Sequence, residues 1–297
     1  MNRRSFLQFA ASTGALAGAV PSLLAADAPK RTPLKKGIMY GTVGIQGASV
    51  ADKFKAIQAA GFQGVEPMSH MDVDEVLRAR DATGLALPSV CCGTHWAKPI
   101  THPSADVRAA SIEGLKHSLR DGKRYGSSSV LFVAGIVNPE IPYADALERA
   151  QKELVPVVDY AADQGVVIAI ENVWNNFMLS PVEAAQFVDS FKSPWVGWHF
   201  DIGNVINYGW PEQWIRTLGP RIKALHIKEY SRAKADKQGK WAGFDVEFLK
   251  GDNNWPAVMK ALDDIQYHGW GIAEQGGAGS SEGLAKLSGE MDRIFAS

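Results

Sequence analysis

Short apolar runs alternate with longer amphipathic stretches along the chain from Lys35 onward. The clearest apolar run is Val166 to Ile170, five small or branched residues with no polar face, which is typical of a strand buried on both sides. The longer stretches carry apolar residues at helical spacing, as Val50, Phe54 and Ile57 do. Strands and helices that alternate in this way indicate βαβ units and a parallel sheet.

Eight such units can be counted, and no linker or change of composition separates them. The expected strands cover residues 37–43, 64–68, 85–92, 129–133, 166–170, 195–200, 222–227 and 269–273. Seven of the expected helices begin near residues 50, 72, 104, 180, 211, 256 and 282, and the helix between the fourth and fifth strands has Leu147, Ala150, Leu154, Val157 and Ala161 on one face. A single (β/α)8 TIM barrel over residues 31–297 is therefore the preferred prediction, with a two-domain Rossmann-type split as the alternative. No GxGxxG or GxxxxGK[ST] follows a strand, which weakens that alternative.

Two local features qualify the pattern. Pro156 lies inside an expected helix and is predicted to break or kink it. The polar segment Ser231 to Asp245 is predicted to be an irregular loop.

Residues 1–30 follow a different pattern. Arg3 and Arg4 precede an apolar, Ala/Gly-rich run to Ala26, which predicts a twin-arginine-type signal peptide with cleavage after Ala28. A disordered or anchoring N-terminus is the alternative. The signal predicts a periplasmic or secreted protein that is exported folded, and it favours a free sugar or glycoside over a phosphorylated substrate. No other segment is long and apolar enough to span a bilayer, so stable membrane insertion is not expected after cleavage.

Composition and charge narrow the function classes. The 297 residues have a formal net charge of −1, which gives no electrostatic reason to expect a nucleic-acid partner. The two cysteines, Cys91 and Cys92, are adjacent and point to opposite faces of a strand, so we expect core residues and no disulfide framework.

Polar residues that could carry chemistry stand at the ends of the last four expected strands. Barrel enzymes gather their active sites at the C-terminal ends of the strands. Here these ends present Glu171, Asp201, His226 and Glu274. Three carboxylates and one imidazole suit a divalent cation, Mn²⁺ before Mg²⁺, Co²⁺ or Zn²⁺. Any one of them could instead cap a helix or pair with a base, but four on consecutive strands favour a metal site.

The same strand ends resemble a known family. The patterns VxIAIEN, WHFDIGN, ALHIKEY and GIAEQGG, in this order, resemble the xylose isomerase-like TIM barrels, the sugar isomerase/epimerase group. Its members include D-tagatose 3-epimerase-type enzymes, hydroxypyruvate isomerase, inosose dehydratase and endonuclease IV. The resemblance implies a metal held by Glu171, Asp201, His226 and Glu274, and it implies that Glu171 and Glu274 are also the catalytic acid and base.

This arrangement predicts a sugar or keto-sugar isomerase or epimerase. A divalent ion that chelates a ketone and a neighbouring hydroxyl acidifies the C–H between them, and two carboxylates can then move the proton through an enediolate. A lyase or dehydratase acting on a 3-keto glycoside or cyclic keto-polyol is the alternative within enzymes. A non-catalytic periplasmic sugar-binding barrel is the alternative from another class, although binding alone needs no acid/base pair. A nuclease ranks low because the chain has no basic surplus and few well-placed histidines.

Further residues are candidates for contact with a small-molecule sugar. They share positions at or near strand ends: Glu66, His95, Trp96, Trp174, His199, Asn204 and Lys228, with Trp241 as another sugar-stacking candidate. Loop hydrogen bonding, ion pairing or packing are the alternative roles. Several relatives have a histidine where this chain has Asn204, which weakens transfer of any one sugar specificity. A homo-oligomer is left open.

Overall fold

The predicted apolar runs form one parallel sheet in the computed structural model, which describes residues 34–297. The strands are β1 Lys35–Met39, β2 Gly64–Glu66, β3 Ser89–Cys91, β4 Ser129–Phe132, β5 Val167–Glu171, β6 Val196–Asp201, β7 Ile222–Ile227 and β8 Trp270–Ala273. Their order in the sheet is β2-β1-β8-β7-β6-β5-β4-β3. Isolated parallel bridges from Gly64 to Ala86 and from Met68 to Cys91 link the β2 and β3 segments. The single (β/α)8 barrel is confirmed, and the two-domain alternative is wrong.

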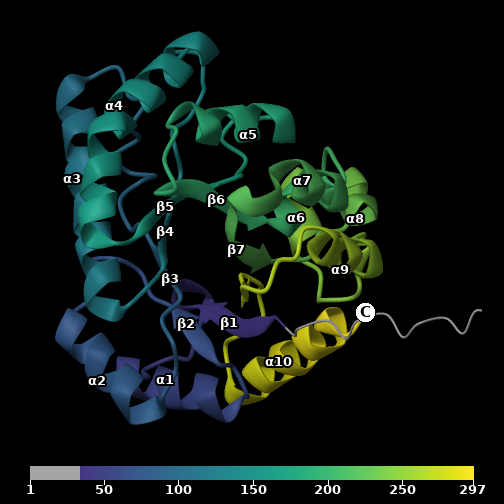
Figure 1. Ribbon diagram of the computed structural model, residues 1–297. Helices are drawn as coiled ribbons and strands as arrows, with labels where there is room; N and C mark the ends of the chain where they lie inside the picture. The colour runs from purple at the N-terminus through teal and green to yellow at the C-terminus, as the bar shows by residue number, and fades with distance from the viewer. Residues whose placement is uncertain (1–33) are drawn as a thin grey trace, which may run out of the picture. The chain divides into compact units, whose positions relative to one another are not determined.

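Helices surround the strands (Figure 1). The longer ones are α1 Val50–Ala59, α2 Val73–Thr83, α3 Ala105–Tyr125, α4 Tyr143–Gln164, α5 Pro181–Ser190, α7 Pro211–Leu218, α9 Trp255–Asp264 and α10 Ser281–Phe295. The shorter ones are α6 Ile202–Ile206, α8 Arg232–Gln238 and the 3-10 helices η1 Tyr40–Thr42, η2 Gly219–Arg221 and η3 Lys240–Phe244. None of the helices within residues 34–297 has the length and apolar character that a membrane span requires. The predicted signal peptide lies outside the described residues.

Side-chain caps explain where several helices start. The hydroxyl of Ser49 accepts the Asp52 amide at the start of α1, and the Asp52 carboxylate returns to Ser49. Asp72 and Ser180 cap α2 and α5 in the same way through one acceptor each. These caps satisfy amide groups that the first turn of a helix leaves without partners.

Four local predictions need correction. The first strand covers residues 35–39 rather than 37–43, because residues 40–42 turn into η1. The third strand covers only residues 89–91, since Pro88 has no amide hydrogen to donate to a neighbouring strand. Helix α4 continues through Pro156, so the predicted break is wrong, and the kink stays a prediction. The segment 231–245 is not irregular: it forms α8 and η3.

Candidate active site

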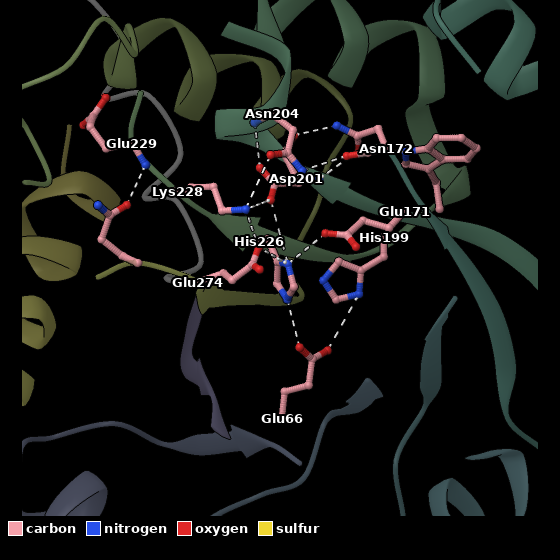
Figure 2. A network of polar contacts seen from close by, with 12 residues as sticks. Glu66, Glu171, Asn172, His199, Asp201, Asn204, His226, Lys228, Glu229 and Glu274 are labelled. Carbon is pink, nitrogen blue, oxygen red and sulfur yellow. Dashed lines mark hydrogen bonds and ion pairs between the residues drawn. The ribbon is translucent and has the colours of Figure 1, made fainter. Parts of the chain in front are cut away.

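The four predicted metal ligands converge at the C-terminal ends of β5 to β8. Glu171 and Asp201 are the last residues of β5 and β6, His226 lies near the end of β7, and Glu274 follows β8. Asp201 and His226 are direct partners in the sheet register. One potential ligand atom from each of the four residues lies within 4.8 Å of the others, and Figure 2 shows the side chains gathered around the His226 ring.

The His226 ring lies among the carboxylates. Its Nδ1 is 3.1 Å from Glu171 Oε1, 3.0 Å from Glu274 Oε2 and 4.0 Å from Asp201 Oδ2. The Lys228 ammonium approaches the same group, 3.0 Å from Asp201 Oδ2 and 2.6 Å from Glu274 Oε2. Lys228 therefore supplies positive charge to two of the three carboxylates.

The two oxygens of Asp201 have different surroundings. Oδ1 accepts the Asn204 amide at 2.8 Å and so caps α6. Oδ2 is buried and has no hydrogen-bond donor aligned on it, and Glu274 Oε2 is in the same situation. Asp201 thus caps α6 with one oxygen and faces the cluster with the other.

This donor set fits a divalent cation. Three carboxylates held close together in a largely buried place need compensating positive charge, which a divalent ion bound to a neutral His226 would supply together with the Lys228 ammonium. The unaligned oxygens of Asp201 and Glu274 and the Nδ1 of His226 form the mixed oxygen and nitrogen set that Mn²⁺, Mg²⁺, Co²⁺ or Zn²⁺ can accept.

The two glutamates of the cluster have opposite protonation tendencies. Burial raises the pKa of Glu171 to about 7. Burial would also raise the pKa of Glu274, but the charges of Lys228 and His226 outweigh it and hold that pKa well below its ordinary value. Neighbouring carboxyl groups whose pKa values are pushed apart are the pattern of an acid and a base that work as a pair.

Three of the predicted substrate contacts, Glu66, His95 and His199, are buried and are not among the residues that line the pocket described below. Glu66 is fully buried, with Oε2 2.8 Å from His226 Nε2 and Oε1 3.9 Å from His199 Nδ1. His199 packs edge-on against His226, with ring centroids 4.2 Å apart, and neither of its ring nitrogens has a hydrogen-bond partner. Burial lowers the pKa of His95 to about 4, and its Nδ1 accepts the amide of Val133. Glu66 and His199 thus lie beside His226, whereas His95 lies against Val133 and Phe132, and none of the three is in the lining of the pocket described below. Their contact with a sugar stays a prediction.

Glu66 decides which nitrogen of His226 carries the proton. With Nδ1 directed at the carboxylate cluster, Nε2–H can donate to Glu66 Oε2 at 2.8 Å. A ligating histidine is commonly oriented by an acceptor on its other ring nitrogen. The carboxylate of Glu66 therefore leaves the Nδ1 lone pair available toward the cluster.

A pocket of about 240 Å³ opens onto the cluster. Its lining consists of Glu171, Glu274, Lys228, Asn204, Val173 and four aromatic residues, Trp96, Trp174, Trp241 and Phe244. Trp96, Trp174, Asn204 and Lys228, all predicted substrate contacts, thus lie where a ligand could touch them. Trp174 is held in place because its indole Nε1 donates to the Asn204 carbonyl at 2.8 Å.

The sequence prediction missed two residues of this region. Asn172 joins β5 to β6: its Nδ2 donates to the Asp201 carbonyl at 2.7 Å, and its Oδ1 accepts the Asp201 amide at 3.0 Å. Its position directly after Glu171 was the available signal. Phe244 lines the pocket from η3, and nothing in the pattern of the segment around it indicated this.

Comparison with known proteins agrees with this geometry. The family model of xylose isomerase-like TIM barrels matches residues 54–291. The Escherichia coli (strain K12) protein named "Putative L-ribulose-5-phosphate 3-epimerase SgbU" is 26% identical over 188 residues, which are 63% of this chain and 65% of that protein. The Haemophilus influenzae protein of the same name is 23% identical over 206 residues, 69% of this chain and 71% of that protein. The aligned part thus spans 65% to 71% of these relatives' lengths.

Solved structures share the fold. The apo crystal structure of 3-keto-D-glucoside 4-epimerase from Escherichia coli has a TM-score of 0.74 at 15% identity and covers 89% of this chain and 100% of its own. The structure of D-psicose 3-epimerase in the presence of D-fructose has a TM-score of 0.72 at 18% identity and covers 88% and 98%. At these identities the likeness establishes the architecture.

Proposed function

The chain belongs to the xylose isomerase-like TIM barrel family, and from this premise we propose that it is a metal-dependent epimerase or isomerase of a keto-sugar. The proposed reaction moves a proton from the carbon beside a carbonyl, through an enediolate, either back to the same carbon from the other face or to its neighbour. Relatives by sequence and by structure are named as sugar epimerases, which supports this reaction class.

A divalent metal, Mn²⁺ first, would be held by Glu171, Asp201, His226 and Glu274, and when bound it would polarise the ketone and acidify the neighbouring C–H. The remaining chemistry belongs to the chain. Glu171 and Glu274 would take up and return the proton, Lys228 keeps Asp201 and Glu274 in place, and Glu66 orients His226.

The observation that carries the proposal is the placement of the two glutamates. Both line the same pocket, and both lie near 3 Å from the same His226 nitrogen. They come from β5 and β8, which are three strands apart around the barrel. Two carboxylates that reach one pocket from different sides can serve the two faces of one substrate carbon.

Proton exchange tests the proposal. The Mn²⁺-loaded protein would be incubated with candidate keto-sugars in D₂O, and deuterium incorporation would be followed by NMR. We expect deuterium at a carbon next to the carbonyl, and we expect its loss with a chelator, in Glu274→Gln and in Glu171→Gln. Glu113→Gln is the matched control, because Glu113 is an exposed residue of α3.

Other outcomes would point elsewhere. Loss of a leaving group from the substrate would favour the lyase or dehydratase. Sugar binding without any exchange would favour a non-catalytic binding barrel and would overturn the proposed function.

A further inference from the structure

The outer part of the candidate active site is aromatic. Trp96, Trp174, Trp241 and Phe244 line the pocket together with Glu171 and Glu274. Trp96 and Trp241 are 54% and 63% exposed, which is unusual for side chains of this size. Exposed indole rings at the mouth of a polar pocket offer flat apolar faces to a ring-shaped ligand.

The two exposed indoles approach the pocket from opposite sides. Trp96 follows β3, whereas Trp241 lies in η3 after β7. These strands are four positions apart in an order of eight, which in a closed barrel is the opposite wall. Trp174, which follows β5, lies against Trp241 and Phe244 with ring centroids 4.8 Å away in each case. The mouth thus has an aromatic wall on the β5–β7 side and a separate indole across from it.

The wall around Trp241 is built rigidly. The Tyr230 hydroxyl donates to the Lys240 carbonyl at 2.8 Å, and the Ser231 amide donates to the Gly243 carbonyl at 2.8 Å. A Cβ on Gly243 would lie 2.4 Å from the Tyr230 ring, so the close approach requires glycine. A surface that is already ordered loses less entropy when a ligand binds to it.

The charges of the pocket do not suit a phosphate. Lys228 is the one cation among the described residues that line it, and its ammonium is occupied by Asp201 and Glu274. Lys240 lies outside the lining, with Nζ over the Trp174 and Trp241 rings at 5.4 and 5.3 Å from their centroids. A phosphate dianion placed in the pocket would face Glu171 and Glu274, and the one cation of the lining, Lys228, is already paired with carboxylates.

The groups at the usual phosphate position of a barrel already have partners within this chain. Many barrels bind phosphate at the loops after the last two strands and a helix N-terminus. In this chain the glycine-rich loop after β8 faces a separate pocket of about 160 Å³ that is also lined by Glu247, Lys286 and Glu290. The Lys286 ammonium already forms an ion pair with Glu247, and Glu290 adds a second carboxyl group. The first turn of α10 is already capped, because Ser280 Oγ accepts the Gly283 amide at 3.1 Å.

From these features we propose that the substrate is an uncharged keto-sugar that carries a second ring, either another sugar or an aromatic aglycone. The reacting sugar would lie over Glu171 and Glu274, and the second ring would lie at the mouth against Trp241 and Trp96. This inference rests on the proposed function and differs in substrate class from the phosphorylated ketose in the names of the sequence relatives.

Two matched series of ketoses test the substrate class. D-Fructose, its 6-O-glucosyl derivative isomaltulose and D-fructose 6-phosphate share one ketose and differ in the group at C6. Methyl and phenyl 3-keto-β-D-glucosides differ in the aglycone. With the Mn²⁺-loaded full chain, we expect kcat/KM to be at least about tenfold higher for the ring-bearing member of a series than for the ring-less member. We expect it to be at least about tenfold lower for the phosphate ester than for the neutral sugar.

Tryptophan variants locate the second ring. Trp241→Ala and Trp96→Ala should lower kcat/KM for the ring-bearing substrate and bring the preference for it close to one. Trp210→Ala is the control, because Trp210 is 55% exposed but does not line the pocket, and it should keep the preference.

The failures of the two proposals can be told apart. Exchange that favours the phosphate ester, or a ring preference that persists in Trp241→Ala and Trp96→Ala, would overturn the substrate class and leave the proposed function intact. Absence of exchange with every ketose would overturn the proposed function, and calorimetric binding of isomaltulose compared with fructose would then still decide whether the mouth binds a second ring.

Discussion

The carboxylate of Glu66 contacts His226, one of the four proposed metal ligands, and does not line the pocket itself. It is fully buried at the end of β2 and meets His226, 160 residues further along the chain, at 2.8 Å. Its charge favours a proton on His226 Nε2 and directs the other nitrogen toward the cluster. From this position we expect Glu66 to orient a metal ligand, while its predicted contact with the substrate stays a prediction.

Replacement of Glu66 should therefore weaken metal binding more than it weakens the fold. Glu66→Gln keeps the size of the side chain but removes its charge, and we expect the Mn²⁺ affinity to fall by about 10- to 100-fold. Calorimetric titration with Mn²⁺ measures this, and circular dichroism checks the fold. Glu113→Gln, an exposed change of the same kind, should leave the affinity unaltered. An unchanged affinity in Glu66→Gln would contradict the positioning role.

At the scale of elements, α4 shows how an unfavourable residue is tolerated. Pro156 is exposed, and so is Lys152, whose carbonyl loses its helical partner to the proline. A carbonyl on the solvent side of a helix can bond to water instead, so the helix continues through the proline.

The same reasoning predicts a stabilising substitution. Pro156→Ala restores the hydrogen bond to the carbonyl of residue 152 and removes the contact with the ring. We expect the free energy of unfolding to rise by about 1–3 kcal/mol, partly offset by the greater freedom of the unfolded chain. Urea denaturation provides the measurement. Val155→Ala, at an exposed neighbouring position, should change stability by no more than about 0.5 kcal/mol. A less stable Pro156→Ala protein would refute this account.

At the scale of the whole molecule, the barrel closes between β2 and β3 through isolated bridges rather than a full ladder. Gly64 lies at this closure and packs under the ring of Trp270. A Cβ on Gly64 would be 2.7 Å from that ring and 2.9 Å from the Ala86 carbonyl oxygen. The close approach of β2 to its neighbours therefore depends on the absence of a side chain.

Gly64→Ala should consequently destabilise the protein. We expect a loss of about 1–3 kcal/mol from overpacking at the closure, measured by urea denaturation. The control is Gly289→Ala in α10, where an added Cβ meets nothing within 4 Å. That change should leave stability equal or raise it by about 0.5–1 kcal/mol, because alanine favours a helix over glycine. Equal stability of the Gly64→Ala protein would show that the closure is looser than described.

Metal binding should also be visible in the stability of the whole barrel. The cluster places three carboxylates beside one lysine, so a divalent ion relieves their repulsion in the folded state only. At 100 times its dissociation constant, Mn²⁺ should add about 2.7 kcal/mol, seen as a rise in melting temperature that a chelator reverses. Asp201→Asn should reduce this rise, whereas Asp236→Asn, on the exposed side of α8, should not. A melting temperature that does not change when Mn²⁺ is added would contradict the proposed metal site.

The sequence by itself determined the barrel, the family and the strand ends that carry Glu171, Asp201, His226 and Glu274. The barrel and its strand ends follow from local periodicity, because a fully apolar run indicates a strand covered on both faces, and the residue after it must lie at the same rim of a parallel barrel. The family was indicated by the resemblance of the four strand-end motifs. The strands of residues 129–132 and 222–227 were predicted to within one residue for the same reason.

Only the tertiary structure decided which polar and aromatic side chains reach the pocket. Glu66, His95 and His199 lie at or near strand ends like the others, yet they are buried and do not line the pocket. Trp241 and Phe244 reach the pocket from a segment predicted to be irregular. Depth along the barrel depends on the stagger between neighbouring strands and on how a long loop packs back over the rim. The stagger and the loop packing are set by contacts between residues far apart in the chain, such as Glu66 with His226 and Trp174 with Trp241. Local periodicity does not predict such contacts.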